Sequence, residues 1–300
     1  MVVSPDMRAA AQSVMPDVVS VALEPLAGGS SAFVAVLVLE SAAGVQRRVV
    51  FRQHTDRTGK EHNGLVASKE FHLTQELAGE GLAVARPLAL HGSEACDGPW
   101  LVSEWVEGTT HVAAHDLDSA LLQMGDYLAR LHHVKPDRLS APGIAQIEDP
   151  VEALPEHLLD DQIGRSIKHV LSAGVERRPN PSVLLHGDFW PGNVMFESGR
   201  LVAVVDWEDA KWGDPLVDLA CARVELACAY GAEASGRFTA SYLASNLQLD
   251  EHDLPLWDIY VSSTALSAMH RWGLSPGIEA ARRRTTGHFL EAAFERLIAI

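Results

Sequence analysis

One stretch of this chain, residues 184–220, constrains its fold more than any other. Short apolar runs within the stretch predict three strands, at 184–185, 194–196 and 201–205. Residues 186–193 form a loop between the first two strands, and Ser198 and Gly199 form a hairpin turn between the last two. This arrangement brings three oxygen-bearing side chains toward one point, those of Asp188, Asn193 and Asp206.

Those three residues have the chemistry and spacing of a phosphoryl-transfer site. The reaction needs a carboxylate that orients the attacking hydroxyl and takes its proton, and it needs oxygen ligands for Mg²⁺. Asn193 lies five positions after Asp188 and Asp206 thirteen after Asn193, which matches a D-x-x-x-x-N loop followed by a second metal-binding Asp. The alternative is that Asp188 and Asn193 are turn residues and Asp206 ends a strand, because these residue types favour turns for local reasons.

The motifs HGDFWPGN, VVDWEDA and GDPLVDLA resemble the aminoglycoside phosphotransferase and choline kinase branch of the protein-kinase-like superfamily. The resemblance implies an α+β, bilobal protein-kinase-like fold. Residues 1–103 would form the nucleotide-binding lobe, with an antiparallel five-stranded sheet and one main helix. Residues 104–108 would form the hinge, and 109–300 a larger, mostly helical lobe with the catalytic loop and the substrate site. Hydrophobic periodicity separately predicts the order of three strands, a helix and two strands in the first lobe.

The resemblance also implies a role for each residue of the 184–220 stretch. Asp188 would be the catalytic residue that orients and deprotonates the acceptor hydroxyl. Asn193 and Asp206 would hold Mg²⁺ between the nucleotide phosphates. His186 and Asp218 would support the loop, Asp218 by accepting hydrogen bonds from its backbone amides, because a buried carboxylate without such partners is costly.

Further candidate residues for nucleotide binding lie in the first 106 positions. Arg52 stands where the family places the basic residue that pairs with the phosphates, usually Lys, and Glu70 is its expected partner. An ordinary surface pair is the alternative for these two. The loop expected to cover the phosphates is the turn Gly28, Gly29, Ser30 and Ser31, although a plain hairpin turn needs no ligand. At the hinge, the backbone of Glu104 and Val106 is expected to bind the adenine base.

Several local predictions concern single elements. Residues 54–66 are polar and predict a mobile loop near the nucleotide, followed by a helix over 68–78. Residues 150–174 predict a helical stretch with a kink or break near Pro155. His132 and His133 are adjacent, so they point about 100° apart on a helix, which favours structural roles over a shared metal ion.

Composition limits the partners and the compartment. The formal net charge of −16 argues against nucleic acid or an anionic membrane surface as a partner, and it suits a cationic substrate. The three cysteines form no CxxC pair, and Cys221 and Cys228 are expected in the core. The first residues show no leader pattern, and no long apolar run appears, so we expect a cytoplasmic protein.

These observations favour an ATP-dependent O-phosphotransferase that acts on a hydroxyl of a small molecule, such as an amino sugar, an aminoglycoside or an amino alcohol. Only eight positions separate Asp206 from Asp214, which leaves no room for the activation segment of a protein kinase. Nothing in the sequence distinguishes ATP from GTP. Two alternatives stay open. The first is a non-catalytic nucleotide-binding regulatory protein of the same fold. The second is a metal hydrolase built on His186, Asp188 and Asp206, although the sequence contains no clustered His and Cys residues at metal-ligand spacing to support it.

Overall fold

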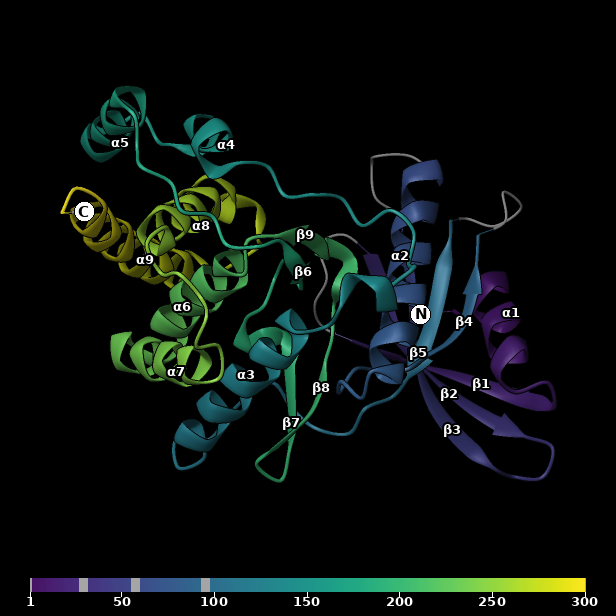
Figure 1. Cartoon of the computed structure of the whole chain (residues 1–300). Helices are drawn as coiled ribbons and strands as arrows, with labels where there is room; N and C mark the ends of the chain where they lie inside the picture. The colour runs from purple at the N-terminus through teal and green to yellow at the C-terminus, as the bar shows by residue number, and fades with distance from the viewer. Residues whose placement is uncertain (1, 27–31, 55–59, 93–97, 300) are drawn as a thin grey trace. The chain divides into compact units, whose positions relative to one another are not determined.

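The computed structural model describes residues 2–26, 32–54, 60–92 and 98–299. By its internal contacts the chain divides into two compact units. Unit 1 contains Met1–Gly108, Asp137–Ile144 and Val202–Glu208, and unit 2 contains Thr109–Pro136, Ala145–Leu201 and Asp209–Ile300. The fold class is the predicted one, α+β, with an antiparallel sheet in unit 1 and mainly helices in unit 2 (Figure 1).

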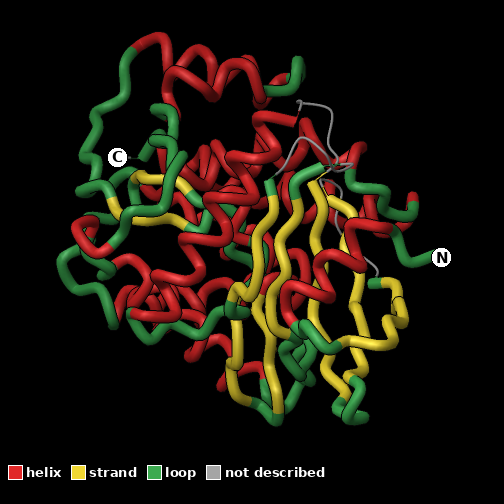
Figure 2. Tube along the Cα trace, turned by 90° about the vertical axis from the view of Figure 1, so that its right-hand side faces the viewer, coloured by secondary structure: helices red, strands yellow, loops and turns green. Residues whose placement is uncertain are grey.

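Unit 1 is built on a five-stranded sheet with the strand order β1-β2-β3-β5-β4, in which all neighbours are antiparallel (Figure 2). Its strands are β1 (Val18–Pro25), β2 (Ala32–Ser41), β3 (Gln46–His54), β4 (Pro87–His91) and β5 (Trp100–Glu104). Its helices are α1 (Pro5–Val14) and α2 (Lys60–Gly79). The predicted order of three strands, a helix and two strands is confirmed.

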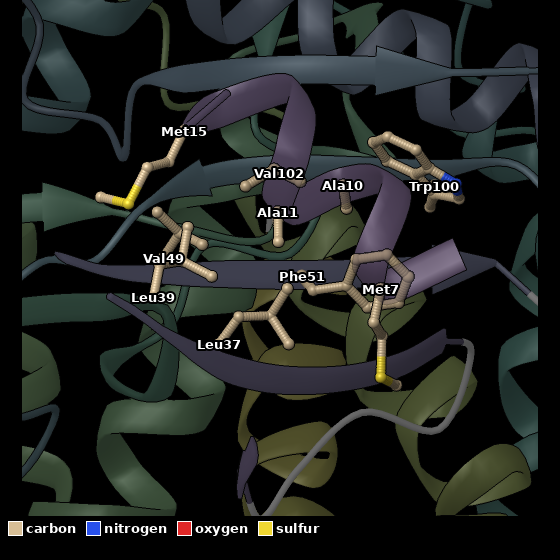
Figure 3. Close-up of a cluster of buried hydrophobic side chains, with 10 residues drawn as sticks. All are labelled: Met7, Ala10, Ala11, Met15, Leu37, Leu39, Val49, Phe51, Trp100 and Val102. Carbon is tan, nitrogen blue, oxygen red and sulfur yellow. The ribbon is translucent and has the colours of Figure 1, made fainter. Parts of the chain in front are cut away.

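Alternation along β3 sends neighbouring side chains to opposite faces of this sheet. Val49 and Phe51 pack with α1, in a cluster that α1 supplies with small and flexible side chains (Figure 3). Gln53 points the same way, because its Nε2 donates to the Asp6 carboxylate of α1 at 2.8 Å. Arg52 therefore faces the other side, toward α2. The members of the cluster are Met7, Ala10, Ala11, Met15, Leu37, Leu39, Val49, Phe51, Trp100 and Val102.

The prediction of a loop over 54–66 is wrong from Lys60 onward, because α2 begins there and runs for 20 residues. In the sequence KEHNG, Lys and Glu favour a helix, whereas His, Asn and above all Gly do not, so the local signal is mixed. Asn63, however, is buried, and its Nδ2 donates to the backbone oxygen of His54 at 3.4 Å. This tertiary contact attaches the first turns of the helix to the end of β3.

Unit 2 is mainly helical, with two small strand pairs. Its helices are α3 (Leu117–His132), α4 (Pro150–His157), α5 (Gln162–Ala173), α6 (Leu216–Tyr230), α7 (Ala232–Ala244), α8 (Leu254–Ala268) and α9 (Pro276–Leu297). Strand β6 (Val183–Leu185) pairs with β9 (Lys211–Gly213), and β7 (Val194–Glu197) pairs with β8 (Arg200–Val204). The turn between β7 and β8 is the predicted one, with positive φ at Ser198 (49°) and Gly199 (75°).

The break in the 150–174 stretch lies three residues beyond the predicted position. Pro155 is inside α4, and the helix ends at His157. Asp161 then caps α5, since its side chain accepts a hydrogen bond from the Gly164 amide at 2.8 Å. Capping by Asp161, rather than the proline, therefore decides where the second helix begins. None of the helices in the described ranges is long and apolar enough to cross a membrane.

Candidate active site

The loop after β6 holds Asp188 and Asn193 in direct contact. Asn193 Nδ2 donates to the Asp188 carboxylate oxygen Oδ2 at 3.0 Å and to the Asp188 backbone oxygen at 2.9 Å. Trp190 Nε1 donates to the same Oδ2 at 3.2 Å. These donors fix the carboxylate, and they direct the Asn193 amide so that its nitrogen faces Asp188 and its oxygen faces away. An oxygen presented in this way suits a hard cation such as Mg²⁺.

Gly187 is required by the backbone of this loop. Its φ is +86°, a region that residues with a side chain rarely adopt. A Cβ at this position would also lie 2.1 Å from the Asp209 backbone oxygen. Both the conformation and the close approach of the 209 backbone therefore demand glycine immediately before Asp188.

Asp218 makes the contacts that the resemblance implies. Its side chain is fully buried on α6, where Oδ2 accepts from the His186 amide at 2.7 Å and Oδ1 from the Gly187 amide at 2.9 Å. His132, which is buried as predicted, lies 3.2 Å from Oδ2 through Nε2, and its Nδ1 contacts the Tyr242 hydroxyl at 2.7 Å. Both oxygens of this buried carboxylate are hydrogen-bonded, and they anchor the two residues before Asp188.

His186 supports the loop from within. The ring is buried, and its Nδ1 accepts a hydrogen bond from the Asp188 amide at 3.2 Å. The amides of His186, Gly187 and Asp188 are thus all hydrogen-bonded by side chains of unit 2.

In unit 1, Arg52 lies among three carboxylates. It contacts Glu70 at 3.2 Å, Asp206 at 2.7 Å and Glu208 at 2.7 Å. The arginine and Glu70 are buried, so the alternative of an ordinary surface pair is wrong. Burial acts to lower the pKa of Arg52, but Glu70, Asp206 and Glu208 outweigh it and raise the pKa. Burial likewise acts to raise the pKa of Glu70, but Arg52, His54 and Lys69 together outweigh it and lower the pKa.

Asp206 has an unusual backbone conformation, with φ of +69° in a residue other than glycine. Such conformations cost free energy and persist only where neighbouring contacts enforce them. The next residue supplies one of these contacts, because the Trp207 side chain is buried and its Nε1 donates to the Val204 backbone oxygen at 3.0 Å. The strained backbone holds the Asp206 carboxylate at Arg52.

Glu208 and Lys69 are members of this cluster that the sequence interpretation did not single out. Glu208 contacts Arg52, and Lys69 Nζ donates to the Glu208 backbone oxygen at 2.5 Å. The sequence feature that could have identified Glu208 is the second carboxylate of the DWE motif, two positions after Asp206. If Arg52 binds phosphates, as the resemblance implies, Glu208 would compete with them for the guanidinium.

Other predicted residues lie in less informative surroundings. The Glu104 amide donates to the Arg86 backbone oxygen at 2.9 Å as part of the sheet, and Glu104 and Val106 are half-buried. Their contact with a base stays a prediction. Gly28, Gly29, Ser30 and Ser31 lie outside the described residues, as does Cys96. Within the described chain, no group of three or more His, Cys, Asp or Glu side chains is placed to hold a metal ion.

The cysteines on α6 are free thiols, and both are half-buried rather than fully enclosed. Burial is the largest cause of the raised pKa of Cys221, and the charges of nearby carboxylates add to it. These carboxylates are Asp188, Glu225, Asp218 and Asp209. Cys221 therefore lies near enough to the Asp188 loop for the charge of Asp188 to act on its thiol, while Glu225 is itself paired with Arg282.

Comparison with known proteins gives one family match and several relatives. The model of the phosphotransferase enzyme family matches residues 22–257. A homoserine kinase from Gluconobacter oxydans is 28% identical over 150 residues, 45% of this chain and 46% of the relative. A hygromycin-B 4-O-kinase from Escherichia coli is 32% identical over 80 residues, 26% of this chain and 24% of the relative. The chain thus matches less than half the length of these curated relatives.

The fold is also that of a solved structure, a thermostable mutant of aminoglycoside phosphotransferase APH(4)-Ia in a ternary complex with AMP-PNP and hygromycin B. The TM-score is 0.67 at 16% sequence identity, over 98% of this chain and 99% of that chain. At this identity the likeness concerns the fold.

Proposed function

Because the chain belongs to the phosphotransferase enzyme family, we propose that it is a small-molecule kinase that transfers the γ-phosphoryl group of a nucleotide to a hydroxyl group. The observation that carries the proposal is the loop of Asp188. Its carboxylate is fixed by Asn193 and Trp190, and the backbone amides around it are held by Asp218 and His186. A protein that only binds nucleotide has no use for a carboxylate oriented this precisely.

In the proposed reaction, Asp188 orients the acceptor hydroxyl and takes its proton as the oxygen attacks the γ-phosphorus. Proximity and orientation provide most of the rate enhancement in such reactions, because the transition state forms few new bonds for the protein to assist. The fixed carboxylate of Asp188 supplies this orientation from the protein side. The bond between the γ-phosphorus and the β–γ bridging oxygen breaks, and the nucleoside diphosphate leaves with that oxygen. The proton stays on the Asp188 carboxyl group and is released to solvent after the product departs.

Arg52 is the proposed partner of the nucleotide phosphates. A guanidinium carries five N–H donors in a planar fork, and phosphate oxygens match this geometry. Glu70 would keep the guanidinium in place. Glu208 and Asp206 hold it while no phosphate is bound, so nucleotide binding would exchange carboxylate contacts for phosphate contacts.

Asn193 and Asp206 are the proposed ligands of Mg²⁺. Both offer hard oxygen donors of the kind that Mg²⁺ prefers, an amide oxygen oriented by Asp188 and a carboxylate. The ion would neutralise negative charge on the phosphates as the transfer proceeds. ATP is the proposed donor, in line with the AMP-PNP of the neighbouring structure, and such a reaction fits the cytoplasm expected from the sequence.

For the acceptor we propose a small molecule that carries an amine beside its hydroxyl. The formal net charge of −16 favours a cationic acceptor. The two curated relatives are named for homoserine and hygromycin B, and both of these molecules carry amines and hydroxyl groups. The charge of the chain and the names of these relatives support the proposal.

The test is an ADP-release assay with Mg²⁺ and ATP or GTP, using amino alcohols, amino acids with a hydroxyl, aminoglycosides and neutral sugars as acceptors. We expect turnover with one amine-bearing class, and its loss in Asp188→Asn, which keeps the size of the side chain. Wild type and variant should bind nucleotide equally. Nucleotide binding without acceptor-dependent ADP release across the panel would instead favour the regulatory alternative.

A further inference from the structure

Unit 2 contains a cavity of about 440 Å³ among three of its helices. Helix α6 packs against both α7 and α9, whereas α7 and α9 scarcely touch each other, and the cavity is lined by residues of all three helices. The volume is within the range of small-molecule sites. The lining residues are Arg223, Ala227, Ala232, Ser235, Gly236, Thr285, His288, Phe289, Ala292 and Arg296.

This cavity is separate from the catalytic loop. On α6 the residues toward that loop are Asp218 and Cys221, as the contacts and charges around them show. Arg223 and Ala227, which line the cavity, lie four apart on a different face, since two positions on a helix correspond to about 200°. The proposed phosphoryl-transfer chemistry thus makes no use of this cavity.

The charge of the lining is the reverse of the charge of the protein. The chain has a formal net charge of −16, yet the lining contains two arginines and a histidine and no carboxylate. Both guanidiniums are oriented by the fully buried Asp258. Arg223 contacts its two oxygens through Nε and Nη2, each at 3.1 Å, and Arg296 contacts Oδ2 at 2.7 Å.

One carboxylate shared by two guanidiniums leaves a net positive charge and unused donors. Arg223 also donates to Thr239 at 2.8 Å, but Arg296 donates to Asp258 alone among the described residues, and an arginine has five N–H groups. Helix α7 begins at Ala232, which borders the same cavity, as does Ser235, although the Ser235 amide already donates to the Gly231 backbone oxygen at 3.4 Å. Amides at the first turn of a helix lack acceptors within the helix and favour an anion.

Besides the polar Ser235 and Thr285, the rest of the lining is apolar, and all of it but Phe289 is small. Alanines 227, 232 and 292, together with Gly236, leave the space open, and the Phe289 ring lies 5.5 Å from the Arg223 guanidinium. From this geometry we propose that the cavity between α6, α7 and α9 binds a small organic anion, with its carboxylate or phosphate at Arg223 and Arg296 and its apolar part against Phe289.

The test is isothermal titration calorimetry on the full chain with 3-phenylpropionate and phenyl phosphate as probes, and with 3-phenylpropanamide as the uncharged analogue of the first. We expect saturable binding of at least one anion with Kd on the order of millimolar, which is ordinary for ligands of this size. The amide should bind at least about tenfold more weakly than the carboxylate, because it lacks the charge that the arginines recognise.

Gly236→Leu fills the cavity without removing any contact. A Cβ at Gly236 meets no atom within 4 Å, and leucine is a better helix former than glycine, so the variant should fold at least as well as wild type. Gly287→Leu is the matched control, because Gly287 is also in a helix with open space around its Cβ but lies on the face of α9 away from the cavity. Ala292→Phe fills the cavity from α9 as a second, independent variant.

We expect Gly236→Leu and Ala292→Phe to weaken anion binding at least about tenfold, and Gly287→Leu to leave it unchanged. Arg296→Gln should reduce the preference for the carboxylate over the amide. Absence of saturable binding of both anions by wild type would overturn the proposal. Equal binding by wild type and both cavity-filling variants, or equal affinity for the carboxylate and the amide, would overturn it as well.

Discussion

Replacement of Asp218 by Asn tests whether its hydrogen bonds support the activity of the Asp188 loop, beyond the stability that any buried hydrogen bond contributes. The two side chains have the same shape, but Asn has one acceptor oxygen and an NH₂ group in place of the second oxygen. In the wild type Oδ2 serves the His186 amide and His132, and Oδ1 serves the Gly187 amide. Whichever way the new amide turns, at least one buried N–H group faces another donor.

The magnitude follows from these contacts. The better orientation keeps the oxygen at His186 and His132 and loses the Gly187 bond. A hydrogen bond to a charged group contributes about 1.5–3 kcal/mol, and an orphaned buried donor costs a similar amount. The remaining bonds weaken because the acceptor is no longer charged. We therefore expect Asp218→Asn to reduce the free energy of unfolding by about 3 kcal/mol.

Asp214→Asn is a closely matched control. Asp214 is also buried, and its two oxygens also accept backbone amides, from Leu216 at 2.9 Å and Asn180 at 2.9 Å. It has no hydrogen bond to the catalytic loop among the described residues. Its Asn variant should lose a similar amount of stability, because the same number of buried backbone donors is involved.

Urea unfolding gives the stability of each variant, and steady-state kinetics at a temperature where all three proteins are folded give the activity. Asp218→Asn should reduce kcat at least about tenfold, because the amides of the two residues before Asp188 lose their anchor, and it should leave nucleotide Kd unchanged. Asp214→Asn should retain wild-type kcat. Equal kcat losses in the two variants, or a stability loss under about 1 kcal/mol for Asp218→Asn, would refute this reasoning.

Four other predictions concern the same sites. Arg52→Met should weaken nucleotide binding by more than tenfold in calorimetry, whereas Arg52→Lys should retain part of it, because lysine keeps the charge but not the fork. Gly187→Ala should lose nearly all turnover while nucleotide still binds, since its Cβ would meet the Asp209 backbone oxygen. The lowered pKa of Glu70 means that its stabilisation is present above the unfolded-state value of about 4.3 and is lost as the pH falls through the lower folded-state value. Urea unfolding between pH 6 and about pH 3 should therefore show a shallower acid loss for Glu70→Gln, and identical slopes would contradict the assignment. Removal of divalent metal with EDTA should abolish ADP release, and Mg²⁺ should restore it; full activity in EDTA would exclude Asn193 and Asp206 as ligands of an essential ion.

The sequence by itself determined the features that depend on near neighbours in the chain. Alternating apolar residues predict the strands of unit 1 in their correct order, because a strand with one buried face has a period of two. The close spacing of Asp188 and Asn193 places both on one loop, where they form a hydrogen bond. Ser198 and Gly199 predict the hairpin turn, because that turn needs residues that tolerate positive φ.

Only the tertiary structure decided contacts between residues far apart in the chain. The first turns of α2 form because Asn63 bonds the end of β3, against the local preference of a polar segment. Glu208 joins Arg52 across 156 positions, and Asp258 holds Arg223 and Arg296 across 35 and 38 positions. The sequence around a charged residue does not indicate its partner, because a Glu or Arg that stays exposed is solvated by water and needs no partner. The fold removes water from such residues, and a buried charge without a partner then costs stability, so the tertiary structure determines which residues pair.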